Sequence, residues 1–215
     1  MNHTVVDVES WERRDLFRLY TGKLKIVMNA TVKLDVTPLV RFQKKHGLRF
    51  YPLMMWVVGK LMNAHEEFKY HLTEEGELWR WDSVSPSYTD FHKDTGRFVK
   101  FATEYSTDLW EFHERCVRDM EAHREESGFL PQIPNVFDIS CLPWITYDEL
   151  SLTVDEGRST LYPVVLWGKY ERHLFRTRMP VTLKINHAVC DGYHLSRFFL
   201  ELQQEINNIG KVKKP

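Results

Sequence analysis

The residues best suited to chemistry lie close together near the end of the chain, between positions 179 and 192. Apolar and polar side chains alternate there, which predicts a β-strand with one apolar face. That face carries Val181, Leu183, Ile185 and, at its end, His187. Asp191 follows four residues later, just before a helical pattern begins. An imidazole at such a junction is well placed to accept a proton, because burial beside an apolar surface favours its neutral form.

The motif His-x-x-x-Asp-Gly is short, and it also has a purely structural interpretation. A histidine at a strand end is commonly a satisfied core or surface residue, and Asp-Gly commonly marks a turn. The motif alone therefore suggests a general base, and other segments of the chain are needed to choose between the catalytic and the structural interpretation.

Helical and strand patterns alternate along the rest of the chain and must position this motif. Helices are expected at 10–20, from Thr37-Pro38 onward, at 52–67, at 108–127 and at 193–208, with Gly210 as the last stop signal. Strands are expected at 24–34, near 70, and at 78–81, 88–91, 98–105, 137–140, 150–154, 161–170 and 179–187, with turns at 75–76 and 171–173. This mixture predicts an α/β fold, a two-layer sandwich with helices packed on a mixed β-sheet, and residues 1–215 are expected to form a single domain.

Composition excludes several classes of function. The 215 residues include 29 Lys and Arg and 30 Asp and Glu, for a formal net charge of −1, so no basic field is available for a nucleic acid. Three cysteines without CxxC spacing and ten histidines without HExxH spacing predict neither a disulfide framework nor a metal site. Without a secretory leader or a stretch near 18 apolar residues, the expected location is the cytoplasm, with no membrane partner.

The segment at 185–194 reads Ile-Asn-His-Ala-Val-Cys-Asp-Gly-Tyr-His and resembles the signature of the chloramphenicol acetyltransferase family. Segments at 11–14, 50–52, 61–65, 81–84, 140–144 and 168–170 agree with that family in order and spacing, so the resemblance covers nearly the whole chain. It implies a fold like that of CoA-dependent acyltransferases. It also implies that acetyl-CoA, as co-substrate, donates its acetyl group to a hydroxyl of a small acceptor.

The resemblance assigns catalytic roles to four residues. His187 matches the histidine that takes the acceptor's hydroxyl proton, so that the oxygen attacks the thioester directly, without a covalent acetyl-enzyme. Ser140 matches the serine that stabilises the oxyanion of the tetrahedral intermediate. Asp191 matches an aspartate that pairs with an arginine near the N-terminus, here Arg13, and the pair holds the active-site turn.

The resemblance also implies binding residues and an assembly. The acceptor pocket is expected to involve Tyr20, Leu24, Phe98, Leu130, Leu152 and Leu166, and the CoA channel Trp144, Lys169 and Tyr170. The family forms homotrimers with active sites between subunits, so His187 is expected to face a pocket built largely by a neighbouring subunit.

Four positions depart from the family's pattern. Asn186 stands where a second histidine is usual, on the strand face opposite His187. Leu130 and Leu150 stand where relatives place phenylalanine in the pocket, and Leu166 replaces a threonine that helps to hold a water. The base and the oxyanion donor are retained while the pocket wall changes.

Three functions stay open on this basis. The favoured one is acetylation of chloramphenicol, which confers resistance. The second is the same reaction on another small alcohol, amine or thiol, and the third is a binding protein that has lost activity. A lipoyl-linked acyltransferase core shares the motif, but the flanking segments match the antibiotic-modifying branch better.

Overall fold

The strands gather into one large and one small sheet in a computed structural model that describes residues 2–151 and 160–214. The large sheet has the order β10-β11-β9-β8-β5-β6-β7, β2 pairs along the other edge of β11, and the small sheet has the order β1-β4-β3. The strands are β1 (His3–Val5), β2 (Val27–Asp35), β3 (Tyr70–Leu72), β4 (Leu78–Trp81), β5 (Ser85–His92), β6 (Arg97–Ala102), β7 (Gly128–Phe129), β8 (Val136–Leu142), β9 (Val164–Gly168), β10 (Glu171–His173) and β11 (Arg176–Asn186). The helices are α1 (Arg14–Arg18), α2 (Thr37–His46), α3 (Phe50–Ala64), α4 (Leu109–Ala122) and α5 (Gly192–Asn208).

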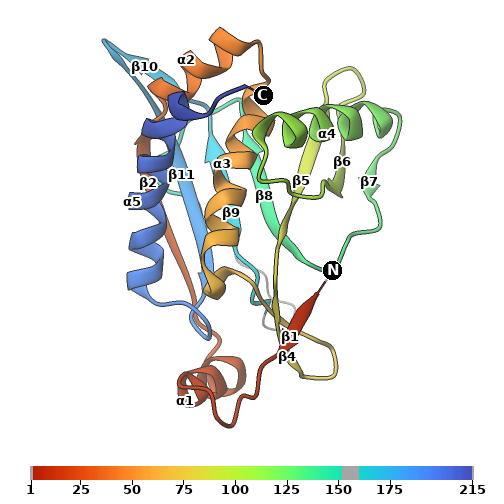
Figure 1. Ribbon diagram of the computed structural model, residues 1–215, viewed down its shortest axis with the longest axis vertical. Helices are drawn as coiled ribbons and strands as arrows, with labels where there is room; N and C mark the ends of the chain where they lie inside the picture. The colour runs from red at the N-terminus through yellow and green to blue at the C-terminus, as the bar shows by residue number, and fades with distance from the viewer. Residues whose placement is uncertain (1, 152–159, 215) are drawn as a thin grey trace.

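Helices α2, α3, α4 and α5 lie on one face of the large sheet, while α1 and the small sheet lie together at one end of the molecule (Figure 1). We call the sheet face under the helices the inner face and the opposite one the outer face. The sheet contains both parallel pairs, such as β5 with β8, and antiparallel pairs, such as β5 with β6. The predicted two-layer α/β sandwich with a mixed sheet is confirmed.

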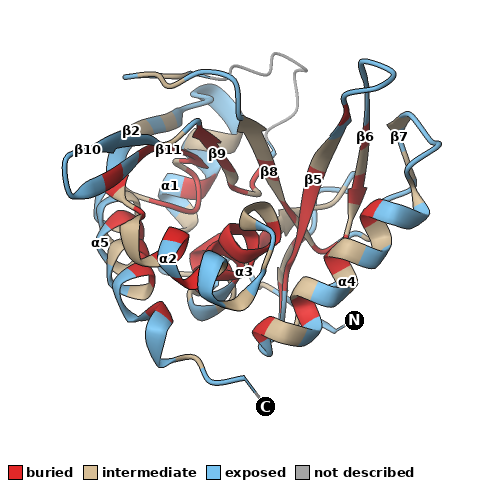
Figure 2. Cartoon of the chain, turned by 90° about the horizontal axis from the view of Figure 1, so that it is seen from above, coloured by how far each residue is buried: buried red, intermediate tan, exposed pale blue. Residues whose placement is uncertain are grey.

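Helix α3 is the centre of the core. Ten of its 15 residues are buried, and it packs against α2, α4 and α5 as well as the sheet. Figure 2 shows its buried residues in the middle of the molecule. A helix that is apolar on nearly every side is stable only when it is enclosed in this way.

Strand pairing determines which side chains share a face. Val181, Leu183 and Ile185 on β11 lie on the inner face and are at most 1% exposed. Ser140 on β8 pairs with Leu166 on β9, which pairs with Thr182 on β11, so these three side chains share the outer face. His187 directly follows the last residue of β11.

The sheet opens between β5 and β8. Their parallel pairing ends at Tyr88 and Ile139, although β5 continues to His92 and β8 to Leu142. Beyond that point the two strands spread apart (Figure 2). The resulting gap connects the inner and outer faces of the sheet.

Most helices begin where the sequence predicts them. Pro38 lies in the first turn of α2, and the helices expected at 52–67 and 193–208 correspond to α3 and α5. The Asp108 side chain accepts hydrogen bonds from the backbone N–H groups of Trp110 and Glu111 and so caps α4. The predicted hairpin at 75–76 joins β3 to β4.

Three local predictions were wrong. Ser10 does not cap a helix, because its hydroxyl bonds to Asp7 and α1 begins only at Arg14, then continues as a π-helical turn, Leu19–Lys23. The expected turn at 171–173 is strand β10, and the chain turns at Leu174 instead, which has a positive φ of 46°. Gly210 does not stop the last helix, since a 3₁₀ turn runs from Ile209 to Lys211.

Further differences concern short or unpaired segments. Strands β1 and β7 were not predicted; they have three and two residues, too few for a visible alternation. Of the strand expected at 150–154, residues 150 and 151 lie outside any strand, and the remainder, with Leu152, lies outside the described residues.

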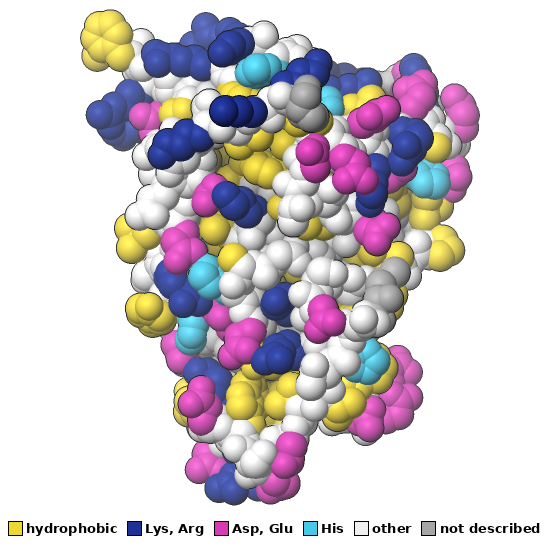
Figure 3. Space-filling view, in the orientation of Figure 1, with side chains coloured by type: hydrophobic (Ala, Val, Ile, Leu, Met, Phe, Trp, Pro, Cys, Tyr) yellow, Lys and Arg dark blue, Asp and Glu magenta, His cyan; other side chains and the backbone are white. Residues whose placement is uncertain are grey.

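Acidic and basic side chains are interspersed over most of the face in Figure 3. Across residues 2–151 and 160–214, no helix combines the length and the apolar character needed to span a bilayer.

Candidate active site

The His187 imidazole is fixed at the end of β11 by contacts on both sides. Its ring stacks on Tyr20, with centroids 4.4 Å apart and planes 13° apart, and its side chain is 25% exposed. Its Nδ1 lies 2.9 Å from the backbone carbonyl oxygen of Cys190. A carbonyl can only accept, so Nδ1 carries the proton and Nε2 keeps its lone pair. This is the tautomer that a general base needs.

Asp191 and Arg13 hold the turn that carries this histidine. The Arg13 guanidinium donates to both carboxylate oxygens of Asp191, at 2.6 and 2.9 Å, and to the backbone carbonyl of His187 at 3.3 Å. The hydrogen bond from Arg13 is the main reason that the pKa of Asp191 is lowered from its ordinary value. The carboxylate therefore stays ionised and lies 3.4 Å from His187 Nδ1.

Two further residues support the turn and were not predicted to do so. His194 accepts a hydrogen bond from the Asp191 backbone N–H at 2.9 Å and completes a capping box at the start of α5. The thiol of Cys190 donates to the backbone carbonyl of Glu67, whose carboxylate pairs with Arg197 on α5. The Cys190–Glu67 contact joins residues 123 positions apart, and no spacing pattern in the sequence predicted it.

Ser140 lies in a different part of the chain, at a cavity in the gap between β5 and β8. The cavity has a volume of 480 Å³. Outer-face residues Thr89, Phe98 and Ser140 line it together with Trp167 on the inner face and Tyr51 on helix α3. It therefore passes through the sheet, from the helix side to the outer side.

A second cavity, of 290 Å³, continues the first on the inner side. The two share Phe50, Cys141, Pro143 and Trp167, and the second also includes Lys169 and Tyr170. The residues predicted for CoA thus lie along one connected passage. Lys169 is exposed, and Trp144 at the other end is 54% exposed and meets Phe91 edge to face at 5.0 Å.

The predicted site residues fall into two groups within one chain. His187, Asp191, Arg13 and Tyr20 form one group, near Leu24, which is 48% exposed. Ser140, Phe98, Trp144, Lys169 and Tyr170 line the passage, with Leu166 beside Ser140 in the sheet and Leu130 bonded to the backbone of Lys100 on β6.

The two groups are far apart. His187 lies five residues beyond Thr182, which is two strands away from Ser140. This corresponds to about 16 Å along the strands and about 10 Å across them. Within one chain the base and the oxyanion donor cannot act on the same atom.

The passage includes functional candidates that the sequence did not identify. Thr89, Phe91 and Lys93 line the 480 Å³ cavity from the end of β5. The sequence predicted a strand here. The last residues of β5 form a cavity wall only because β5 diverges from β8, which the sequence does not reveal.

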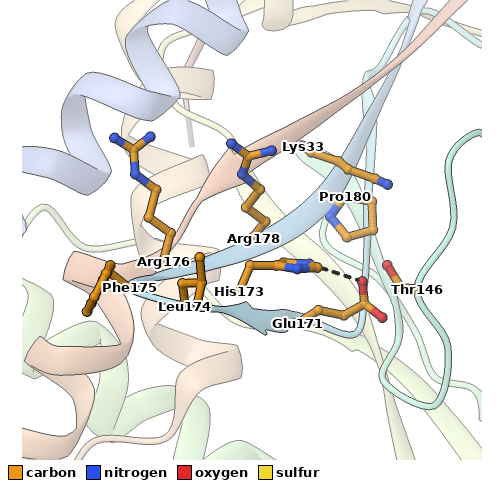
Figure 4. Close-up of a pocket in the computed structure, with 9 residues that line it drawn as sticks. All are labelled: Lys33, Thr146, Glu171, His173, Leu174, Phe175, Arg176, Arg178 and Pro180. Atoms are coloured by element: carbon orange, nitrogen blue, oxygen red, sulfur yellow. Dashed lines mark ion pairs between the residues drawn. The ribbon is translucent and has the colours of Figure 1, made fainter.

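Another cavity, of 490 Å³, lies by the β10–β11 hairpin and contains none of the predicted site residues (Figure 4). Lys33, Arg176 and Arg178 line it, beside the exposed Phe175. Thr146, Glu171 and His173 line it as well, and Lys33 is paired with Asp148, but none of the residues matched to the family's catalytic groups is among them.

Solved structures share this fold. A chloramphenicol acetyltransferase matches with a TM-score of 0.83 at 19% sequence identity, covering 95% of this chain and 100% of that one. The dihydrolipoamide acetyltransferase of Azotobacter vinelandii matches with a TM-score of 0.67 at 19% identity, covering 86% and 83%. The chain therefore has the fold of CoA-dependent acyltransferases.

Sequence comparison narrows the class. The family model described as chloramphenicol acetyltransferase matches residues 1–203. The chloramphenicol acetyltransferase of Escherichia coli is 35% identical over 204 residues, covering 94% of this chain and 93% of the relative. That of Clostridium perfringens is 32% identical over 211 residues, covering 97% and 96%. The chain belongs to the chloramphenicol acetyltransferase family.

Proposed function

We propose that the protein transfers the acetyl group of acetyl-CoA to a hydroxyl of chloramphenicol, with His187 as the general base. The observation that carries this proposal is the hydrogen bond from His187 Nδ1 to the Cys190 carbonyl, because it leaves Nε2 free to accept a proton. Four curated relatives named chloramphenicol acetyltransferase, at 31–35% identity, support the choice of acceptor.

The reaction balances without a covalent enzyme intermediate. Nε2 of His187 takes the proton of the acceptor hydroxyl as its oxygen attacks the thioester carbonyl. The Ser140 hydroxyl donates a hydrogen bond to the oxyanion of the tetrahedral intermediate. When the C–S bond breaks, the CoA thiolate leaves and recovers the proton from the imidazolium.

The passage through the sheet supports a route for acetyl-CoA. Lys169 and Tyr170 at its inner end are suited to the phosphate-bearing part of CoA, because a lysine acts as a point charge towards phosphate. The pantetheine arm then extends past Trp144 to Ser140 on the outer face. No metal takes part in this scheme. Acetyl-CoA is made and used inside cells, so we place the reaction in the cytoplasm.

The separation of the two groups supports a homotrimer with active sites between subunits. In this arrangement His187, Asp191, Arg13 and Tyr20 of one subunit face the Ser140 cavity of its neighbour. The acceptor then lies between Tyr20 and Leu24 on one side and Phe98, Leu130 and Leu166 on the other. Cyclic symmetry gives three equivalent sites.

The test is thiol release from acetyl-CoA in the presence of chloramphenicol. The wild-type protein should turn over, and His187→Ala should lower kcat by a factor of about 10²–10⁴, the usual contribution of a general base. His173→Ala, on the exposed end of β10, is the matched control and should be unaffected. A normal rate in His187→Ala would disprove the mechanism, and no release by the wild type would disprove the acceptor.

A further inference from the structure

The outer face of the sheet carries a cluster of three charged side chains beside the Ser140 cavity. Lys100 on β6 donates to Asp138 on β8 with Nζ 2.8 Å from Oδ2, and the two side chains are 21% and 19% exposed. Lys184 on β11 lies in the same row, since Asp138 pairs with Val164 and Val164 with Lys184. Lys184 is 7% exposed.

Neighbours of the ion pair on the outer face line the cavity. Thr89 lies opposite Lys100 in the register of β5 and β6, Phe98 precedes Lys100 by two residues on the same face, and Ser140 follows Asp138 by two. All three of these residues line the 480 Å³ cavity. The backbone carbonyl of Lys100 also accepts a hydrogen bond from the N–H of Leu130. The ion pair therefore lies beside Phe98, Leu130 and Ser140, which are proposed to surround the acceptor.

The charges of the cluster do not cancel. Two ammonium groups share one carboxylate, and in the described parts of the chain Lys184 makes no hydrogen bond or ion pair of its own. Burial lowers the pKa of Lys184, and the charge of Asp138 opposes that shift. An ammonium has three donors, and Lys100 uses one of them on Asp138. Its ring contact with Phe129, 6.0 Å to the centroid, leaves the remaining donors available.

A charged pair whose side chains are about four-fifths buried costs desolvation energy and is therefore a poor source of stability. It can instead discriminate between ligands, because a buried donor rejects a ligand that leaves it unpaired. A cluster with excess positive charge matches an oxygen group that bears negative charge.

We propose that Lys100, held in place by Asp138, is a specificity-determining residue that donates to a negatively polarised oxygen group of the acceptor, such as an aromatic nitro group or a carboxylate. Lys184 adds a second positive charge behind the same region. This inference rests on the proposed function, because it places the acceptor at Ser140 and Phe98. Beyond the proposed function, it states that the pocket recognises a substituent at the end of the acceptor remote from the reacting hydroxyl.

The test is a pair of acceptors that differ in one substituent: chloramphenicol, which has an aromatic nitro group, and its analogue with methylthio in that place. Binding of each is measured by calorimetry. The wild type should bind the nitro compound more tightly, and Lys100→Met should weaken that binding about tenfold, as expected for loss of a charge-assisted hydrogen bond. Binding of the methylthio compound should change by no more than about twofold. An analogue with a carboxylate there shows which of the two oxygen groups fits better.

Further variants separate recognition from folding. Lys100→Met leaves Asp138 unpaired, so the double variant Lys100→Met/Asp138→Leu removes both charges and should lose the same preference. Asp138→Asn keeps the Lys100 ammonium and should retain the preference for the nitro compound. Lys60→Met, which removes a lysine paired with Glu205 on the helix side, is the matched control.

Equal binding of both acceptors by the wild type, or an unchanged preference in Lys100→Met and in the double variant, would overturn the inference. If the proposed function is wrong, the wild type will release no thiol. The binding ratios are measured by calorimetry and do not depend on turnover.

Discussion

At the scale of single residues, the turn after β11 controls both the position and the tautomer of His187. The Cys190 carbonyl sets the tautomer, and the stacked Tyr20 ring fixes the plane of the imidazole. Arg13 then joins the turn to the N-terminal segment through Asp191 and the carbonyl of His187. Removing either Arg13 or Asp191 should therefore loosen the whole turn that carries His187.

The Arg13–Asp191 pair should therefore stabilise the fold in a pH-dependent way. The pKa of Asp191 is lowered in the folded protein, so its contribution is complete above its unfolded value of about 4 and is lost as pH falls through the lower folded value. Arg13→Leu should reduce the free energy of unfolding at pH 7 by about 1–2 kcal/mol, between the values for exposed and buried pairs because Asp191 is partly exposed. Urea denaturation at several pH values tests this. A stability difference that stays constant down to pH 3 would contradict it.

The sequence predicted the principal side chains at this scale but not their supports. His187, Asp191, Arg13 and Ser140 are found from motif spacing and family resemblance. The Cys190 carbonyl and the Glu67–Arg197 pair depend on how the backbone turns and on which helix packs beside α5, and neither is encoded in a short pattern.

At the scale of elements, capping chemistry explains one correct and one wrong helix start. Asp108 and Ser10 are both residue types that cap helices. Asp108 has free N–H groups within reach and caps α4, whereas the Ser10 hydroxyl bonds to the Asp7 side chain at 2.8 Å. A local bond that competes with capping cannot be recognised from residue type alone.

The Asp108 cap should contribute measurably to stability. Its carboxylate accepts from the N–H groups of Trp110 at 2.8 Å and Glu111 at 2.9 Å, and the negative charge also interacts favourably with the helix dipole. Asp108→Ala should lower the free energy of unfolding by about 1 kcal/mol. Thr107→Ala, one residue earlier and outside the helix, is the control. Thermal or urea denaturation checks both, and equal stability of the two variants would refute the assignment.

At the scale of the whole molecule, strand β2 and the segment before it are more exposed than the sequence pattern predicts. The sequence predicted alternating apolar residues over 24–34 as a half-buried row. In the structure, only Leu34 of that row is buried at 3% exposure, whereas Leu24 is 48%, Ile26 37% and Val32 37% exposed. In the proposed trimer a neighbouring subunit would cover this exposed row, and an alternating pattern is the same whether the covering surface belongs to the same chain or to another one. The single-domain assignment likewise stays a prediction.

An active site formed by His187 of one subunit and Ser140 of its neighbour predicts a result that a site within one chain cannot give. His187→Ala and Ser140→Ala should each be nearly inactive as pure proteins, the second because loss of an oxyanion donor costs about 10²–10³ in kcat. When the two variants are co-expressed, mixed trimers pair the intact His187 of one subunit with the intact Ser140 of its neighbour. Random mixing then restores about a quarter of the wild-type sites. Thiol release by the purified mixed trimers measures this, with the two pure variants combined after purification as the control. If Ser140 and His187 acted within one chain, every site would carry a mutation and co-expression would restore nothing.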